Sequence, residues 1–134
     1  MNEKTVKEWI KKAEHDLKIG KDEYNTENPV TDMICFHMQQ CVEKCLKAYL
    51  IFHGKEIKKT HIIEELIKEC KNIDPDFQKL IEFNTHILTS YAVEIRYPGE
   101  FSEPSIEETK EAINLAEEVK KFVLKKLKEK GFKY

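Results

Sequence analysis

The stretch from Thr31 to Gly54 constrains the fold most, because it contains no proline and carries apolar residues at almost every helical spacing. At about 100° per residue, its apolar side chains cover more than half of a helix circumference. A helix this apolar must be covered by neighbours on two or three sides. The sequence therefore predicts a central helix with a single open polar strip, formed by Gln40, Glu43, Lys44 and Lys47. We look for a functional site on this strip.

Length and charge set limits on the class of protein. A chain of 134 residues suits one domain, which we place at residues 1–134, and it can bury a core without disulfides or metal. Its 23 basic and 25 acidic residues leave a net charge of −2, which excludes a bulk polyanion binder. No apolar run reaches the length of a signal-peptide core or a membrane span. We therefore predict a cytoplasmic protein without membrane contact.

The rest of the chain shows four further helical segments with apolar stripes and start or stop signals. Thr5 and Thr60 are expected to cap the first and third helices, and Asp74 followed by Pro75 to start the fourth. Ser105 and Glu108 have the spacing of a capping box. No strand pattern is present, so we predict an all-α, five-helix up-and-down bundle. The expected helices cover about residues 4–24, 31–54, 61–71, 75–96 and 105–130.

Three polar residues project toward apolar positions. Asp16 lies at the margin of the first stripe, where it can form a salt bridge to a neighbouring helix or serve a functional site. Gln39 and Asn84 project into apolar stripes and need hydrogen-bonding partners inside the bundle. Each amide can either fix the register of two helices or line a polar groove.

The cysteines and histidines do not form a metal-binding pattern. The four cysteines form no C-x-x-C pair and are expected to be reduced core residues. No histidine has a glutamate three positions before it, as a di-iron bundle requires. His37, Cys41 and Cys45 form an i, i+4, i+8 ladder, but this ladder lacks a fourth ligand. We predict neither a metal nor a cofactor.

The segment from Tyr91 to Pro98, YAVEIRYP, is the sharpest local signal. A proline disfavours helical backbone at the residue before it, so the fourth helix must end near Arg96. The guanidinium of Arg96 can bind the last carbonyls of its own helix. Alternatively, together with Tyr91 and Tyr97, it suits a phosphate and a stacked base.

Four segments taken in this order resemble one family. They are AEHDL (Ala13 to Leu17), CFHMQQCVEKCLKAYLIFHG (Cys35 to Gly54), His61 at the start of the third helix, and YAVEIRYPG (Tyr91 to Gly99). The Q-x-x-E-K-x-x-K-A spacing and the R-Y-P run are weak separately and fairly specific together. The chain resembles the HEPN domain, the higher-eukaryote and prokaryote nucleotide-binding family, over nearly its whole length.

The resemblance implies a five-helix bundle that often dimerises and is in many cases encoded beside a small nucleotidyltransferase, as one half of a toxin–antitoxin-like pair. Ribonuclease members carry an arginine followed four to six residues later by histidine. Arg96 matches that arginine, but the next positions hold Glu100, Phe101 and Ser102. The resemblance therefore implies binding rather than cleavage, through Arg96, Tyr97, Asp16, Lys47 and His61.

Three functional hypotheses follow. The first is a non-catalytic HEPN-type module that binds a nucleotide, RNA or a nucleotidyltransferase partner. The second is a divergent metal-independent ribonuclease, with Arg96 and with His61 or His37 as the catalytic candidates. The third is a helical protein-interaction module without a ligand.

Apolar residues at the edges of the last two stripes predict a homodimer. Phe83 and Ile87 lie at the edge of the fourth stripe, and the last helix spreads its apolar residues over a wide arc: Leu115, Val119, Phe122, Val123 and Leu127. We expect part of this surface to meet a second copy across a two-fold axis. Such a dimer would bring two Arg96 ends towards one shared cleft.

Overall fold

The computed structural model describes residues 2–57, 59–91 and 103–134, and every regular element in these ranges is helical. The α-helices are α1 (Glu3–Tyr24), α2 (Thr31–Phe52), α3 (Ile63–Ile73), α4 (Gln78–Glu82) and α5 (Ile106–Glu129). Two 3₁₀ helices, η1 (Pro75–Phe77) and η2 (Thr85–Tyr91), flank α4. The all-α prediction is confirmed.

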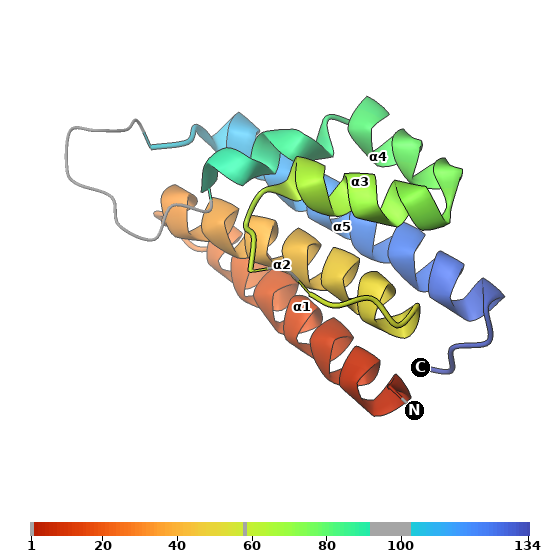
Figure 1. Cartoon of the computed structure of the whole chain (residues 1–134). Helices are drawn as coiled ribbons and strands as arrows, with labels where there is room; N and C mark the ends of the chain where they lie inside the picture. Colours follow the sequence, from red (N-terminus) through yellow and green to blue (C-terminus); the bar gives the residue numbers. More distant parts are fainter. Residues whose placement is uncertain (1, 58, 92–102) are drawn as a thin grey trace.

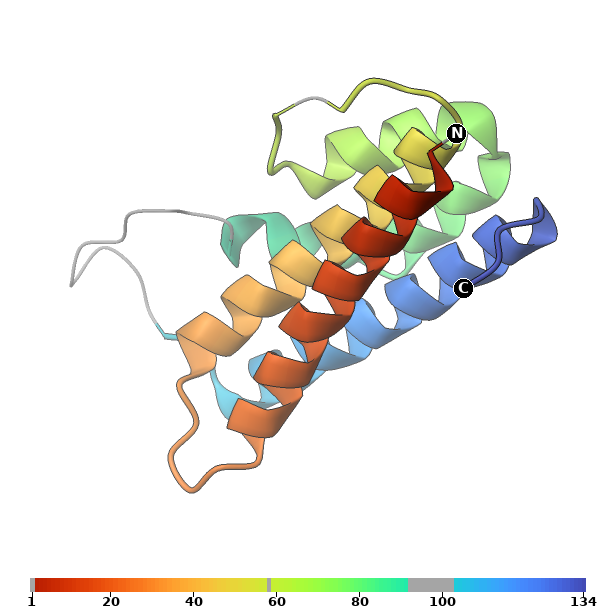
Figure 2. The ribbon, with the colours of Figure 1, turned by 90° about the horizontal axis from the view of Figure 1, so that it is seen from below.

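The central position of α2 is also confirmed. It packs against α1, α3, α5 and η2, and Figures 1 and 2 show α1 running along one of its sides and α5 along another. Its buried apolar residues form the middle of the core, and they include Ile34, Met38, Val42, Leu46, Tyr49 and Leu50. All four cysteines are buried free thiols. Burial raises the pKa of Cys70, which keeps this thiol protonated and unreactive.

The structure confirms the predicted capping residues of α5 but not that of α1. Ser105 Oγ accepts a hydrogen bond from the Glu108 N–H at 3.0 Å, and the Ser105 N–H donates to Glu108 Oε1 at 2.9 Å, which completes the predicted capping box. Thr5 lies inside α1, whose N-cap residue is Asn2, so that prediction was wrong.

The third helix begins two residues later than predicted, at Ile63. Thr60 Oγ1 accepts from the N–H of Ile62 at 3.1 Å and thereby forms a turn before the helix. The first N–H of α3, on Ile63, is bound by Thr89 Oγ1 of η2 at 2.9 Å. The cap of α3 is therefore a tertiary contact, which local sequence signals do not show.

The fourth helix was predicted as continuous, and this was wrong for the described part. Asn84 adopts a left-handed conformation with φ 62°, and it separates α4 from η2. Asparagine tolerates this conformation better than most residues, so the break is accessible here. As a result Asn84 is exposed, contrary to the predicted buried amide, while Leu80 and Leu88 on either side of it reach the core.

The predicted excess of apolar surface on the last helix was also wrong. The apolar residues of α5 are covered within one chain, because α1, α2 and η2 all pack against this helix. Only Phe122 of the predicted set is partly exposed, whereas Phe83 and Ile87 are exposed as expected. The buried members are Leu115, Val119, Val123 and Leu127.

Candidate functional site

We define the polar face of α2 as His37, Gln39, Gln40, Glu43, Lys44 and Lys47. Its side chains contact Asp16 of α1 and His61, which lies just before α3. The prediction that this strip is open was wrong. The side chains of Glu43 and Lys47 are only 6% and 8% exposed. Ionic groups in such surroundings need partners, and here they form two clusters, each centred on one carboxylate.

The first cluster joins α1 to α2 through Asp16. Its carboxylate accepts from His37 Nδ1 at 2.8 Å with one oxygen and from Lys44 Nζ at 2.6 Å with the other. The Asp16 side chain is buried, so the predicted salt bridge to a neighbouring helix is confirmed. One carboxylate fixes both a lysine and a histidine of the polar face.

The second cluster centres on Glu43 and has the same composition. Glu43 Oε2 accepts from Lys47 Nζ at 2.8 Å, and Oε1 accepts from His61 Nδ1 at 2.9 Å. Gln39 Nε2 donates to Glu43 Oε1 and to the His61 carbonyl oxygen, both at 3.1 Å, which confirms Gln39 as a buried amide. Gln40 in turn donates to Gln39 Oε1 at 2.7 Å.

Electrostatics keep the Glu43 carboxyl ionised. Burial raises its pKa, but the hydrogen bonds from Lys47, His61 and Gln39 outweigh burial, and the pKa lies below the ordinary value of 4.5. An ionised carboxylate can only accept hydrogen bonds, so His61 Nδ1 carries the proton of this contact. Glu43 thus sets the tautomer and the orientation of an imidazole that is 48% exposed.

The arrangement is close to neutral. Asp16 pairs with Lys44 and Glu43 pairs with Lys47, so each of these lysines has its own counter-charge. The lysines therefore orient the carboxylates and add little attraction for an anion. Among the described residues, no group of three or more histidine, cysteine, aspartate or glutamate side chains is placed to hold a metal ion.

Comparison with known proteins identifies the family of the chain. The HEPN domain family matches residues 6–127, which is most of the chain. This chain belongs to the HEPN family. The predicted resemblance is confirmed, and the residues of both clusters lie inside the matched region of the HEPN domain.

Named relatives agree with this assignment. The chain is 37% identical to a protein of Methanocaldococcus jannaschii named "Putative toxin MJ1304", over 93% of this chain and 92% of that protein. It is similar to the crystal structure of ST0689, an archaeal HEPN homologue, with 29% identity, a TM-score of 0.70, and coverage of 91% of this chain and 97% of that one. The crystal structure of TT1696 from Thermus thermophilus has 26% identity and a TM-score of 0.74, with 95% and 100% covered.

Two residues of the predicted HEPN site, Arg96 and Tyr97, lie outside the described residues. The described chain before them ends at Tyr91, beside Cys35 of α2 and Glu108 of α5. Burial, together with these neighbours, raises the pKa of Tyr91 to about 12 and keeps its hydroxyl protonated. In the part of the HEPN domain that the structure describes, no helix is long and apolar enough to cross a membrane.

The predicted residues within the described ranges fall in both clusters. Lys47 and His61 share the carboxylate of Glu43, while Asp16 centres the other cluster. Sequence reasoning missed Glu43 and Lys44 as site residues, although both stand on the polar arc that it identified. Both residues stand three or four positions from Gln40 and from Lys47. This spacing places the four side chains on one side of the helix and could have indicated that they share a site.

Proposed function

We propose that this HEPN domain is a non-catalytic module of a toxin–antitoxin-like pair that binds a nucleotide or RNA. The ligand is held between the polar face of α2 and the segment that carries Arg96. A relative named as a toxin supports the setting. The observation that carries the proposal is the half-exposed His61, which is held by the buried Glu43 and lies close to the end of η2.

Position supports the shared role of His61 and Arg96. Thr89 Oγ1 lies 2.9 Å from the N–H of Ile63, two residues after His61, so the chain leaves η2 beside this histidine. Arg96 follows Tyr91 by five residues, and chain length alone keeps their Cα atoms within about 18 Å. The segment is therefore long enough to bring Arg96 to the His61 side of the bundle.

The pairing of charges at the polar face of α2 indicates which residue would attract a phosphate. Because Lys44 and Lys47 are paired with carboxylates, we assign the main attraction for a phosphate to Arg96. Arg96 is the only arginine in the sequence, and its planar fork suits bidentate contact with phosphate. His61 adds a hydrogen bond, Tyr97 adds a stacking surface, and Asp16 and Lys47 act as positioning residues.

Sequence supports binding without cleavage. The positions after Arg96 that match the family's catalytic histidine hold Glu100, Phe101 and Ser102. Phenylalanine has no proton to transfer, serine does not titrate near neutral pH, and a glutamate would serve as general acid or base there only with a raised pKa. We further propose a homodimer and a minimal nucleotidyltransferase as protein partners, in keeping with the family resemblance.

Replacing Arg96 with alanine is expected to weaken RNA or nucleotide binding by about 10- to 150-fold, the effect of losing a charged hydrogen bond of about 1.5–3 kcal/mol. Arg96→Lys should recover only part of the affinity, because lysine keeps the charge and loses the fork. Calorimetry with a nucleotide and with short RNA measures both. Lys12→Ala, at an exposed position of α1, controls for the loss of one positive charge. Equal affinity of Arg96→Ala and wild type would exclude the proposed role.

A second candidate, a metal-independent ribonuclease, is favoured by one observation. A carboxylate that fixes the Nδ1–H of an exposed imidazole is how proteins orient a general base, and Glu43 does this for His61. If RNA is cleaved in EDTA, His61→Ala should abolish cleavage and Glu43→Gln should reduce it strongly. Our proposal instead expects intact RNA after long incubation of the wild type, with electrophoresis as the measurement.

A further inference from the structure

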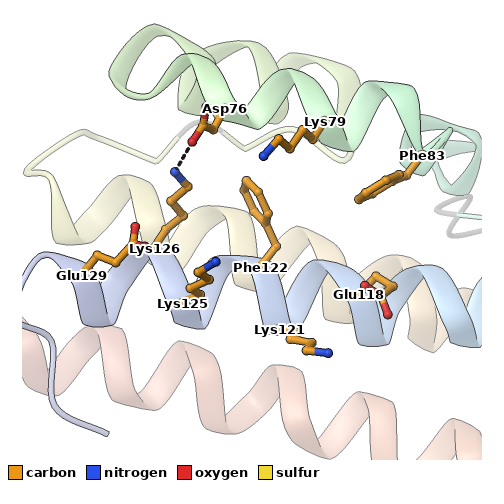
Figure 3. Close-up of a pocket in the computed structure, with 9 residues that line it drawn as sticks. All are labelled: Asp76, Lys79, Phe83, Glu118, Lys121, Phe122, Lys125, Lys126 and Glu129. Atoms are coloured by element: carbon orange, nitrogen blue, oxygen red, sulfur yellow. Dashed lines mark hydrogen bonds and ion pairs between the residues drawn. The ribbon is translucent and has the colours of Figure 1, made fainter.

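A groove between α4 and α5 lies on a different face of the bundle from the polar face of α2. We call it the α4–α5 groove and define it by Lys79, Phe83, Lys121, Phe122, Lys125 and Lys126. Figure 3 shows Phe122 rising from α5 between the two elements, with Lys79 and Phe83 on the opposite wall. The groove encloses about 290 Å³, close to the lower end of ligand sites.

The lysines of the groove differ in their partners. Lys126 is held by Asp74 at 2.8 Å and by Asp76 at 2.6 Å, so its charge is already balanced. The side chains of Lys79, Lys121 and Lys125 are exposed, and their ammonium groups form no hydrogen bond or ion pair with any other described residue. Three cations are therefore available to an anionic ligand.

The positive surface continues beyond the groove. Lys121, Lys125 and Lys128 follow each other at i, i+4 and i+7 on one side of α5, and they line an adjoining hollow. Glu118 and Glu129 stand at the groove and reduce its charge without pairing with these lysines. A row of lysines along a helix suits a ligand with regularly spaced negative charges.

The aromatic side chains fit the same kind of ligand. Phe122 packs on the buried Phe77 with ring centroids 5.0 Å apart, which holds it in place beside the groove. Phe83 is 47% exposed and lines the groove together with the lysines. An exposed aromatic ring beside unpaired lysines is the combination that binds single-stranded nucleic acid.

We propose that the α4–α5 groove binds single-stranded RNA, with a base stacked on Phe83 and the backbone phosphates on Lys79, Lys121 and Lys125. The choice of RNA rests on the proposed function. The groove is formed by α5 and the η1–α4 segment, so a strand held here lies outside the nucleotide site at the polar face of α2. RNA would then gain affinity from the groove, whereas a mononucleotide would not.

The experiment measures binding of a fluorescein-labelled single-stranded RNA of about 12 nucleotides by fluorescence anisotropy over a range of salt concentrations. Phe83→Ala should weaken binding by roughly 5- to 150-fold, the equivalent of one stacked base, with an unchanged salt dependence. Lys121→Gln with Lys125→Gln should reduce the slope of log K against log salt by about 1.4, the value for two phosphates of a single strand.

Controls separate this surface from general charge. Lys11→Gln with Lys12→Gln, at exposed positions of α1, removes the same charge and should leave the slope unchanged. A labelled duplex of equal length should bind more weakly, because its bases cannot stack on Phe83. Wild-type affinity of Phe83→Ala, or equal slopes for the two lysine pairs, would overturn the proposal. If polyglutamate displaces the labelled RNA as well as unlabelled RNA does, the proposal is overturned, and the groove instead suits an acidic protein.

Arg96→Ala distinguishes failure here from failure of the proposed function. If only Arg96→Ala weakens binding, the groove proposal is wrong and the proposed function stands. If only the groove variants weaken binding, RNA is bound by the groove alone. Wild-type affinity in all variants would contradict both proposals.

Discussion

Replacing Glu43 with alanine is expected to lower the free energy of unfolding by about 3–5 kcal/mol, because it leaves a buried lysine without its counter-charge. The Lys47 side chain is 8% exposed, and its Nζ lies 2.8 Å from Glu43 Oε2. The same change removes the acceptor for His61 Nδ1 and for Gln39 Nε2. Urea or guanidinium unfolding at neutral pH measures the loss.

A double-mutant cycle identifies the cause. Glu43→Leu combined with Lys47→Met places apolar groups of similar size in the same space and should recover most of the stability, because no unpaired charge remains. Glu8→Ala, at an exposed position of α1, is the matched control and should change stability by less than about 0.5 kcal/mol. Additive effects of the Glu43 and Lys47 changes would contradict the pairing.

The loss of unfolding free energy caused by Glu43→Ala should become smaller as the pH falls. The pKa of Glu43 is lowered in the folded chain, so its carboxylate stabilises the fold above about pH 4.5 and loses this effect as the pH falls through the folded pKa. The difference in stability between wild type and variant should therefore be largest near neutral pH and smaller near pH 3. Asp74 and Glu14 also have lowered pKa values, but they contribute equally to both proteins.

Replacing Phe77 with alanine is expected to lower the free energy of unfolding by about 3–5 kcal/mol, as for other buried phenylalanines. Phe77 is fully buried, and its ring centroid lies 4.5 Å from that of Tyr49 on α2 and 5.0 Å from that of Phe122 on α5. It thus joins the η1–α4 segment to α2 and to α5. Denaturant unfolding measures the effect.

The chain supplies its own control for this prediction. Phe83 follows six residues later and is 47% exposed, so Phe83→Ala removes the same atoms from the surface and should cost less than about 0.5 kcal/mol. A similar loss for both variants would mean that Phe83 is covered in solution, for example by a second copy of the chain. This comparison also establishes that Phe83→Ala is folded in the RNA experiment.

Much of the fold was predictable because its causes are local. The apolar spacing within 31–54 predicted α2, and Ser105 with Glu108 predicted the start of α5, since both signals act within a few residues of the chain. The marginal position of Asp16 likewise predicted a contact with a neighbouring helix, which the bonds to His37 and Lys44 confirm.

Other features depend on which segments meet in space. Leu80 and Leu88 both reach the core on either side of the break at Asn84, and the first N–H of α3 is bound by Thr89, 26 residues further along the chain. Periodicity placed Glu43 and Lys47 on a polar arc, but it could not show that the chain near His61 covers them. Their pairing is decided by burial, because a carboxylate and an ammonium removed from water must find each other, whereas on an open strip both could remain solvated.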